Sequence, residues 1–308
     1  MPQVKTVVDE TLAGLRADVA ASELAGLTRS WATEIVNAGG LLQNGKPLRK
    51  SEKLRLGAQI ELNWLPKPEP EVVPRDVPGL EIIYDDDQIV AVNKPAGVAA
   101  HPSQGWDGAC VLDGLAARGF EIATSGVHER QGIVHRLDQG TSGVMVVAKS
   151  EYAYAELKRQ FKDREVRKVY HALVQGHPDP FRGTIDAPLG RDPRHEWRFA
   201  VVTDGKRAIT HYETLEAFSH ATLLEINIET GRTHQIRVHM SAQRHPCVGD
   251  IMYGGDPKLA EKLGISRQWL HASELEIVHP TTGEPMIFNS EYSADLVKSL
   301  EILAAGLS

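Results

Sequence analysis

Apolar and polar positions at the start of the chain predict a small module of two helices and several strands. Apolar residues recur at roughly helical spacing over residues 12–27, and a second helix is expected over residues 28–36. The Asn44-Gly45 pair is typical of a tight hairpin turn, and residues 59–62 alternate between polar and apolar side chains as a strand does. We therefore expect residues 1–64 to form a separate α/β module.

Prolines mark the end of this module. Residues 66–78 contain five prolines with acidic residues between them, a density that forbids a helix and breaks strand pairing. We expect an extended linker of limited flexibility over residues 65–79, followed by a large domain over residues 80–308.

The large domain contains many short apolar runs and one clear amphipathic helix at residues 151–161. Strands are expected at residues 82–84, 89–92, 133–134, 144–148, 168–174 and 223–228. This strand-rich order with few long helices predicts an α+β fold, with a mixed, largely antiparallel sheet and flanking helices.

A polar turn separates the apolar runs at residues 133–134 and 144–148. Its two glycines, Gly140 and Gly143, let the backbone turn tightly, so Asp138 is expected to be held rigidly at the edge of the core. Asp138 could cap a hairpin, which the spacing alone favours slightly, or it could carry out chemistry. A protein-kinase catalytic loop is excluded, because a leucine separates the arginine from the aspartate and no glycine-rich phosphate loop or Asp-Phe-Gly follows.

The composition is ordinary for a globular protein of about two domains, with 308 residues of which 42% are hydrophobic and 24% charged. No apolar run approaches membrane-spanning length, and residues 1–10 lack the basic-then-apolar pattern of a signal peptide, so we expect a cytoplasmic protein. Two cysteines, Cys110 and Cys247, cannot by themselves form a disulfide framework or a zinc cluster.

The charge distribution leaves room for a nucleic-acid partner although the net charge is −7. Residues 69–87 carry −6 and residues 272–308 carry −5, which leaves +4 on the remainder of the chain. A local basic groove can therefore exist, but the field of the whole molecule will not steer RNA strongly.

Two basic segments could contact phosphate groups or could be ordinary solvated turns. The first segment is the run Lys46, Arg49, Lys50, Lys53 and Arg55. The second segment, residues 190–212, combines arginines with a tryptophan, which suits RNA backbone contact and base stacking. Its residues of interest are Arg191, Arg194, Trp197 and Arg198.

Several motifs of the large domain together resemble the RluA/RluD family of RNA pseudouridine synthases. The first is His135-Arg136-Leu137-Asp138, followed by Thr141-Ser142-Gly143 and an apolar run that ends in Ala148-Lys149. The other matches stand in the family's order: Asn93-Lys94-Pro95-Ala96-Gly97, His101-Pro102, Lys168-Val169-Tyr170-His171-Ala172, Gly231-Arg232-Thr233-His234-Gln235-Ile236-Arg237 and Leu270-His271-Ala272. The similarity covers residues 80–290, and residues 12–63 resemble the alpha-L RNA-binding module.

The resemblance implies an isomerase that acts on uridines of RNA without a cofactor or a metal. It implies that Asp138 is the nucleophile, that Tyr170 stacks on the target base, and that Arg237 pairs with Asp138, through two parallel hydrogen bonds if the geometry allows. RNA contacts are expected from His135, Arg136, Thr141, Arg191, Arg198 and Arg232 of the large domain and from Lys46, Arg49 and Lys50 of the module.

The expected substrate is ribosomal RNA of the large subunit (23S), and the expected oligomeric state is a monomer. A paired uridine must be flipped out of its stack, and Arg136 is a candidate for filling the vacated space, although a simple phosphate contact is the alternative. The sequence leaves open which uridine is modified and whether Asp138 attacks ribose C1′ or the base.

Two other functions fit parts of the chain. A catalytically silent RNA-binding or ribosome-assembly factor could use the N-terminal module, but the presence of Asp138, Tyr170 and Arg237 disfavours inactivity. A metal-dependent hydrolase could use His234, His239 and His245. However, only Glu229 supplies a nearby carboxylate, and the i,i+5 spacing does not make a helical pair of metal ligands.

Overall fold

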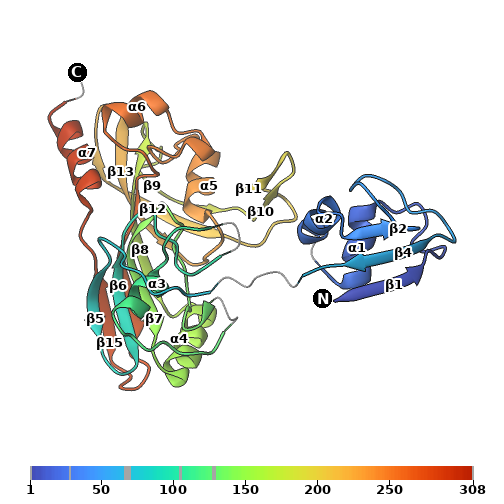
Figure 1. The fold of residues 1–308 in the computed structure, drawn as a ribbon. Coiled ribbons are helices and arrows are strands. Elements are labelled where there is room, and N and C mark those ends of the chain that lie inside the picture. Colours follow the sequence, from blue (N-terminus) through green and yellow to red (C-terminus); the bar gives the residue numbers. More distant parts are fainter. Residues whose placement is uncertain (1, 28, 66–70, 104–105, 127–129, 307–308) are drawn as a thin grey trace. The chain divides into compact units, whose positions relative to one another are not determined.

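The computed structural model describes the chain except for residues 1, 28, 66–70, 104–105, 127–129 and 307–308 (Figure 1). Its contacts divide the chain into two compact units, residues 1–69 and residues 70–308. In the part of the chain that is described, no helix is long and apolar enough to cross a membrane.

The N-terminal unit is a four-stranded sheet in the order β1-β4-β2-β3 with two helices. Its elements are β1 (Gln3–Val7), α1 (Ala17–Ala25), α2 (Arg29–Asn37), β2 (Leu41–Gln43), β3 (Lys46–Pro47) and β4 (Gln59–Asn63). Asn44 and Gly45 both have positive φ angles, of 50° and 78°, which confirms the predicted hairpin turn. The predicted start of the second helix, residue 28, lies outside the described residues.

The first predicted helix starts later than its apolar pattern indicates. Residues 12–14 form turns because Gly14 has a φ of 80° and donates its N–H to the Leu54 carbonyl, while Leu15 accepts from the Leu54 N–H. The apolar residues of this stretch therefore pack into the core of the unit without being helical. Strand β1 carried no recognised signal in the sequence.

Residues 71–79 of the proline-rich segment are attached to the large unit. The side chain of Val77 is only 1% exposed and packs in the main core of that unit. The Asp113 carboxylate accepts a hydrogen bond of 2.8 Å from the Val73 N–H. Prolines 66, 68 and 70 of the predicted linker lie outside the described residues.

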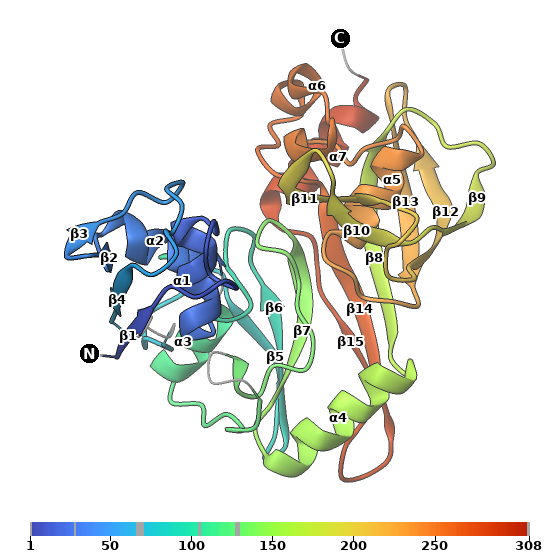
Figure 2. The ribbon, with the colours of Figure 1, turned by 90° about the vertical axis from the view of Figure 1, so that its right-hand side faces the viewer.

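The large unit contains a nine-stranded sheet in the order β5-β6-β7-β14-β8-β13-β12-β9, with β15 paired to β14 (Figures 1 and 2). All neighbouring pairs are antiparallel except β7 and β14, so the predicted α+β fold with a largely antiparallel sheet is confirmed. The strands are β5 (Glu81–Asp85), β6 (Ile89–Lys94), β7 (Ser142–Ala148), β8 (Arg167–Gln175), β9 (Arg182–Asp186), β12 (Ile209–Ala217), β13 (Ala221–Ile228), β14 (Leu270–Val278) and β15 (Pro285–Asn289).

Helices and one hairpin surround this sheet. The helices are α3 (Val111–Ala117), α4 (Glu151–Asp163), α5 (Gln235–Ala242), α6 (Pro257–Lys262), α7 (Ala294–Ala304) and the 3₁₀ turn η2 (Ile251–Tyr253). The basic segment at residues 190–212 is largely a hairpin of β10 (Leu189–Asp192) and β11 (His195–Val201), followed by the start of β12.

Strand β7 is buried on both faces and fixes the residues that precede it. Val144 and Val146 belong to the cluster that includes α4, while Met145 and Val147 belong to the cluster that includes α3 and α5. The predicted strand at residues 133–134 is wrong, because Ile133 makes only an isolated bridge to Val147. Asp138 thus lies in an irregular loop that leads into β7, and not in a hairpin between two strands.

Gly143 allows β7 and β14 to meet just after this loop. Its φ is 120°, and a Cβ atom at this position would lie 2.2 Å from the Ala272 carbonyl oxygen. Ser142 and Gly143 pair in parallel with His271 and Ala272. A glycine is therefore required here to hold the start of β7 against β14.

Candidate active site

Asp138 lines two adjoining pockets. Its own loop is tightened by a 3.0 Å hydrogen bond from the Thr141 N–H to the Asp138 carbonyl, and Leu137 anchors it in the core. The side chain of Asp138 remains 17% exposed. A carboxylate in this position is fixed yet reachable.

Arg237 of α5 donates one hydrogen bond to Asp138, but its two parallel hydrogen bonds go to Asp250. Nη1 donates to Asp138 Oδ2 at 3.2 Å, whereas Nε and Nη2 donate to the two carboxylate oxygens of Asp250 at 2.6 and 3.0 Å. The expected pair of parallel bonds to Asp138 is thus replaced by a pair to Asp250 and a single bond to Asp138. Asp250 lies just before η2 and orients the guanidinium from the side away from Asp138.

Two of these three charged side chains are almost completely buried. The side chains of Arg237 and Asp250 are 6% and 1% exposed. Burial by itself would lower the pKa of Arg237, but Asp250 and then Asp138 outweigh burial and raise it. Arg237 is therefore always charged and provides a fixed cation for the Asp138 carboxylate.

Tyr170 of β8 and Asp138 line the same hollow, a pocket of about 90 Å³ whose wall also includes Ile228 and Leu270. Tyr170 is largely buried, and its pKa is raised first by burial and then by the negative charge of Asp138. Its phenol is thus neutral at physiological pH and offers an aromatic surface beside the carboxylate. A larger hollow of about 670 Å³ adjoins this pocket, and the two share Arg136, Leu137, Asp138, His234 and Arg237.

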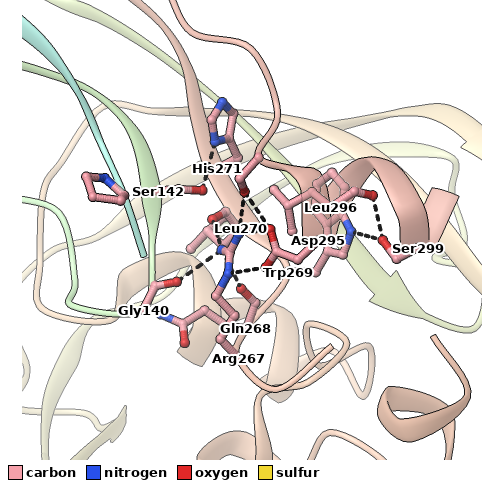
Figure 3. Close-up of polar contacts among 12 residues, drawn as sticks. Gly140, Ser142, Arg267, Gln268, Trp269, Leu270, His271, Asp295, Leu296 and Ser299 are labelled. Atoms are coloured by element: carbon pink, nitrogen blue, oxygen red, sulfur yellow. Dashed lines mark hydrogen bonds and ion pairs between the residues drawn. The ribbon is translucent and has the colours of Figure 1, made fainter. Parts of the chain in front are cut away.

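Two basic side chains, those of Lys94 and Arg267, hold the main chain just after Asp138. Lys94 Nζ donates to the carbonyls of Pro95, Val98 and Gln139 at 2.9, 2.8 and 3.2 Å, and burial lowers its pKa to about 7 although Asp138 opposes this shift. Arg267 Nη1 donates to the Gly140 carbonyl at 3.2 Å (Figure 3). The loop is therefore positioned by bonds to consecutive carbonyls.

One pocket thus brings together a carboxylate, a fixed guanidinium and a buried aromatic side chain. Known proteins share the sequence around these three residues. The profile of the family described as RNA pseudouridylate synthase matches residues 88–242, which include Asp138, Tyr170 and Arg237. The chain belongs to this family. It is an isomerase that acts on RNA.

Similar proteins extend the match over nearly the whole synthase. An uncharacterized RNA pseudouridine synthase of Mycobacterium tuberculosis is 57% identical over 96% of both chains. The ribosomal large subunit pseudouridine synthase D of Xanthomonas campestris is 38% identical, over 97% of this chain and 92% of the relative. Among solved structures, human RNA pseudouridylate synthase domain containing 4 is 26% identical with a TM-score of 0.57, over 73% of this chain and 93% of that one.

Arg136, Thr141 and Arg232 of the synthase also line the smaller pocket. Arg136 and Arg232 are exposed, and Arg232 Nε donates to the Arg207 carbonyl at 3.0 Å. Thr141 is buried, and its hydroxyl accepts from Gln268 Nε2 at 3.3 Å. The two arginines are thus exposed at the pocket, whereas Thr141 supports the loop from inside.

His135 points away from both hollows. Its ring stacks on Phe161 of α4 with centroids 4.6 Å apart, and its Nε2 accepts the Val146 N–H at 3.0 Å. Burial, followed by the positive charge of Lys168, lowers the pKa of His135 to about 3. The expectation of an RNA contact gains no support from this position, and the ring instead packs between Phe161 and β7.

The remaining predicted RNA-binding residues line neither hollow around Asp138. Arg191 and Arg198 lie on the β10–β11 hairpin. The guanidinium carbon of Arg191 is 4.7 Å from the centre of the Phe199 ring, and that of Arg198 is 5.1 Å from the centre of the Tyr253 ring. In the N-terminal unit, the side chains of Lys46, Arg49 and Lys50 are exposed.

His234 faces the site, although the sequence suggested only a metal-ligating role for it. Its Nε2 lies 4.0 Å from Asp138 Oδ2, and its Nδ1 bonds to the Tyr253 hydroxyl at 2.7 Å. That hydroxyl also accepts from the Phe199 N–H at 3.2 Å, so Tyr253 links His234 to the β10–β11 hairpin. His234 lies within the Gly231–Arg237 motif, which was the sequence signal that could have placed it at the site.

Metal ligation gains no support at this position. Across the described residues, no group of three histidines, cysteines or acidic residues could hold a metal ion.

Proposed function

We propose that this synthase isomerises specific uridines of 23S ribosomal RNA with Asp138 as the nucleophile, acting as a monomer in the cytoplasm. The observation that carries the proposal is the single bond from the buried Arg237 to a carboxylate that stays reachable from the pocket. The similarity to proteins named ribosomal large subunit pseudouridine synthase D supports the choice of RNA.

In the proposed reaction the N-glycosidic bond breaks, the uracil turns over, and its C5 bonds to ribose C1′. The C5 proton is lost and N1 gains a proton, so substrate and product have the same composition and no oxidant or reductant is needed. Asp138 attacks either C1′ or the base, and the hydrogen bond from Arg237 Nη1 orients the Asp138 carboxylate. The target nucleotide is flipped out at a cost of a few kcal/mol, and Arg136 fills the vacated space.

The direct test is to incubate the purified protein with transcribed 23S ribosomal RNA and to map pseudouridine by mass spectrometry. New pseudouridine at one or a few positions supports the proposal. RNA binding without any product would instead indicate a silent ribosome-assembly factor. Mapping ribosomal RNA from a strain that lacks the gene identifies the uridine in the cell.

Tyr170 is proposed to stack on the target base. We expect Tyr170→Phe to keep RNA binding and to lose only what the hydroxyl contributes. We expect Tyr170→Ala to lose an additional amount of about 1–3 kcal/mol, because base–aromatic stacking is removed as well. Single-turnover rates and RNA affinities of the two variants measure this difference. An Ala variant no worse than the Phe variant would exclude the platform role.

The N-terminal unit is proposed to bind ribosomal RNA through its exposed basic run. It has its own hydrophobic core, so deleting residues 1–64 should leave the large unit folded. RNA affinity should fall by about 100-fold because one of two linked binding units is lost. Filter binding measures the affinity, and circular dichroism checks the fold.

A matched full-length control replaces only Lys46, Arg49 and Lys50 with alanine. If the basic run makes the contacts, this variant should reproduce most of the loss in affinity. Unchanged affinity and turnover on full-length RNA after the deletion would show that the unit does not deliver the substrate.

A further inference from the structure

Arg267 links the catalytic loop to the C-terminal helix. It lies three residues before β14, and its Nη1 donates to the carbonyl of Gly140, two residues after Asp138, at 3.2 Å (Figure 3). The Arg267 side chain is 10% exposed, so water competes little for this bond. Through it, Arg267 determines the path of the main chain just behind the carboxylate.

The other side of the guanidinium is fixed by α7. Nε and Nη2 donate to Asp295 Oδ2 and Oδ1 at 2.8 and 3.0 Å, and Nη2 also donates to the Ser293 hydroxyl at 2.9 Å. The Ser293 hydroxyl in turn donates to Asp295 Oδ1 at 2.6 Å. Because Arg267 is bound by both carboxylate oxygens of Asp295, the plane of its guanidinium is fixed, and so is the direction of Nη1.

Asp295 is ionised at neutral pH and can therefore hold Arg267. Burial by itself would raise the pKa of Asp295, but the hydrogen bonds from Arg267 and Ser293 outweigh burial and lower it. Neither Asp295 nor Ser293 lines the hollows around Asp138. Asp295 can therefore act on the reaction only indirectly, through Arg267 or through the docking of α7.

We propose that Arg267 is a positioning residue for uridine isomerisation, held by Asp295 so that its bond to the Gly140 carbonyl sets the placement of the Asp138 carboxylate. This inference rests on the proposed role of Asp138 as the nucleophile. Errors of about 1 Å in the placement of a reacting group can cost about 100-fold in rate, so a bond to the adjacent main chain has leverage on catalysis.

The structure offers a matched control on the same helix. The Ser299 hydroxyl of α7 accepts a 2.6 Å hydrogen bond from Trp269 Nε1 and donates to the Leu296 carbonyl (Figure 3). Ser299→Ala therefore removes an anchor of α7 without touching Arg267. Asp295→Ala removes an anchor of α7 and also releases Arg267.

The test compares full-length Asp295→Ala, Asp295→Asn and Ser299→Ala on 23S ribosomal RNA transcripts. It measures the single-turnover rate, the Kd for RNA and the Tm of each variant. We expect Asp295→Ala to lower the rate by about 10- to 100-fold with an unchanged Kd. Asp295→Asn, which keeps one acceptor for Arg267, should recover part of the rate. Ser299→Ala should keep the rate even where its Tm falls as far.

Three outcomes overturn the inference. A rate that is unchanged in Asp295→Ala excludes positioning. If Asp295→Ala changes only the Kd, Arg267 is an RNA contact in the larger hollow. If Asp295→Ala and Ser299→Ala lose equal amounts of rate, Arg267 serves only to dock α7. If Asp138→Asn is active, the proposed function itself has failed, whereas a fully active Asp295→Ala beside an inactive Asp138→Asn rejects only the role of Arg267.

Discussion

Asp138→Asn is expected to lose about 10⁴-fold or more in single-turnover pseudouridine formation while keeping its fold and its affinity for RNA. The amide has nearly the shape of the carboxylate and can still accept the hydrogen bond from Arg237 Nη1. It is not a nucleophile, so no covalent step can begin. The measurement is product formation with enzyme in excess over transcribed RNA, together with the Kd and the unfolding midpoint.

Two further variants make this result decisive. Asp138→Ala should be equally inactive, and it cannot regain a carboxylate by deamidation. Gln139→Ala changes the exposed neighbouring side chain but keeps the carbonyl that Lys94 binds, so it should remain active. Pseudouridine formed by either Asp138 variant, purified from a host without other enzymes for that site, would falsify the nucleophile assignment.

Arg237→Met is expected to lose nearly all activity and about 3–5 kcal/mol of stability, because two negative charges are left without their partner. Most of the stability loss should come from Asp250, which is 1% exposed and accepts two of the three bonds that Arg237 donates to carboxylates. Arg237→Lys should keep more of the stability but recover little activity, since an ammonium cannot donate to Asp250 and Asp138 in the same geometry.

A double-mutant cycle in urea unfolding separates the two partners. Combining Arg237→Met with Asp250→Asn should restore most of the lost stability, whereas combining it with Asp138→Asn should restore less, because Asp138 is 17% exposed and receives one bond. Arg159→Met, which breaks the solvent-accessible ion pairs of Arg159 with Glu156, Asp163 and Glu165, should cost less than Arg237→Met. Additive effects of Arg237→Met and Asp250→Asn would contradict the coupling.

Local signals predicted the parts of the fold that depend on neighbouring residues. The Asn44-Gly45 turn, the strand β7 and the helix α4 follow from backbone preferences and from spacing of apolar side chains, and the structure contains all three. The predicted strand at residues 133–134 failed because an apolar pair can be partly buried beside a single β-bridge without belonging to a strand.

The partners of buried charges could not be predicted in the same way. Motif spacing indicated that Arg237 is near Asp138, but Asp250 takes the fork because a turn after α5 brings it to the other side of the guanidinium. Likewise, His135 adjoins Arg136 in sequence, yet its ring turns to the opposite side and stacks on Phe161. Such choices depend on tertiary packing and not on local sequence.

The bonds from Lys94 and Arg267 to the carbonyls of residues 139 and 140 have an evolutionary consequence. Main-chain acceptors are present whatever the side chain, so the exposed Gln139 can be exchanged without loss of the bond that Lys94 makes. A Cβ at residue 140 would lie 2.5 Å from Gln268 Oε1, so a side chain there would require Gln268 to move. Gln139 borders the larger hollow, so under the proposed function a change of this side chain can alter the RNA contact while the bonds that hold the loop stay the same.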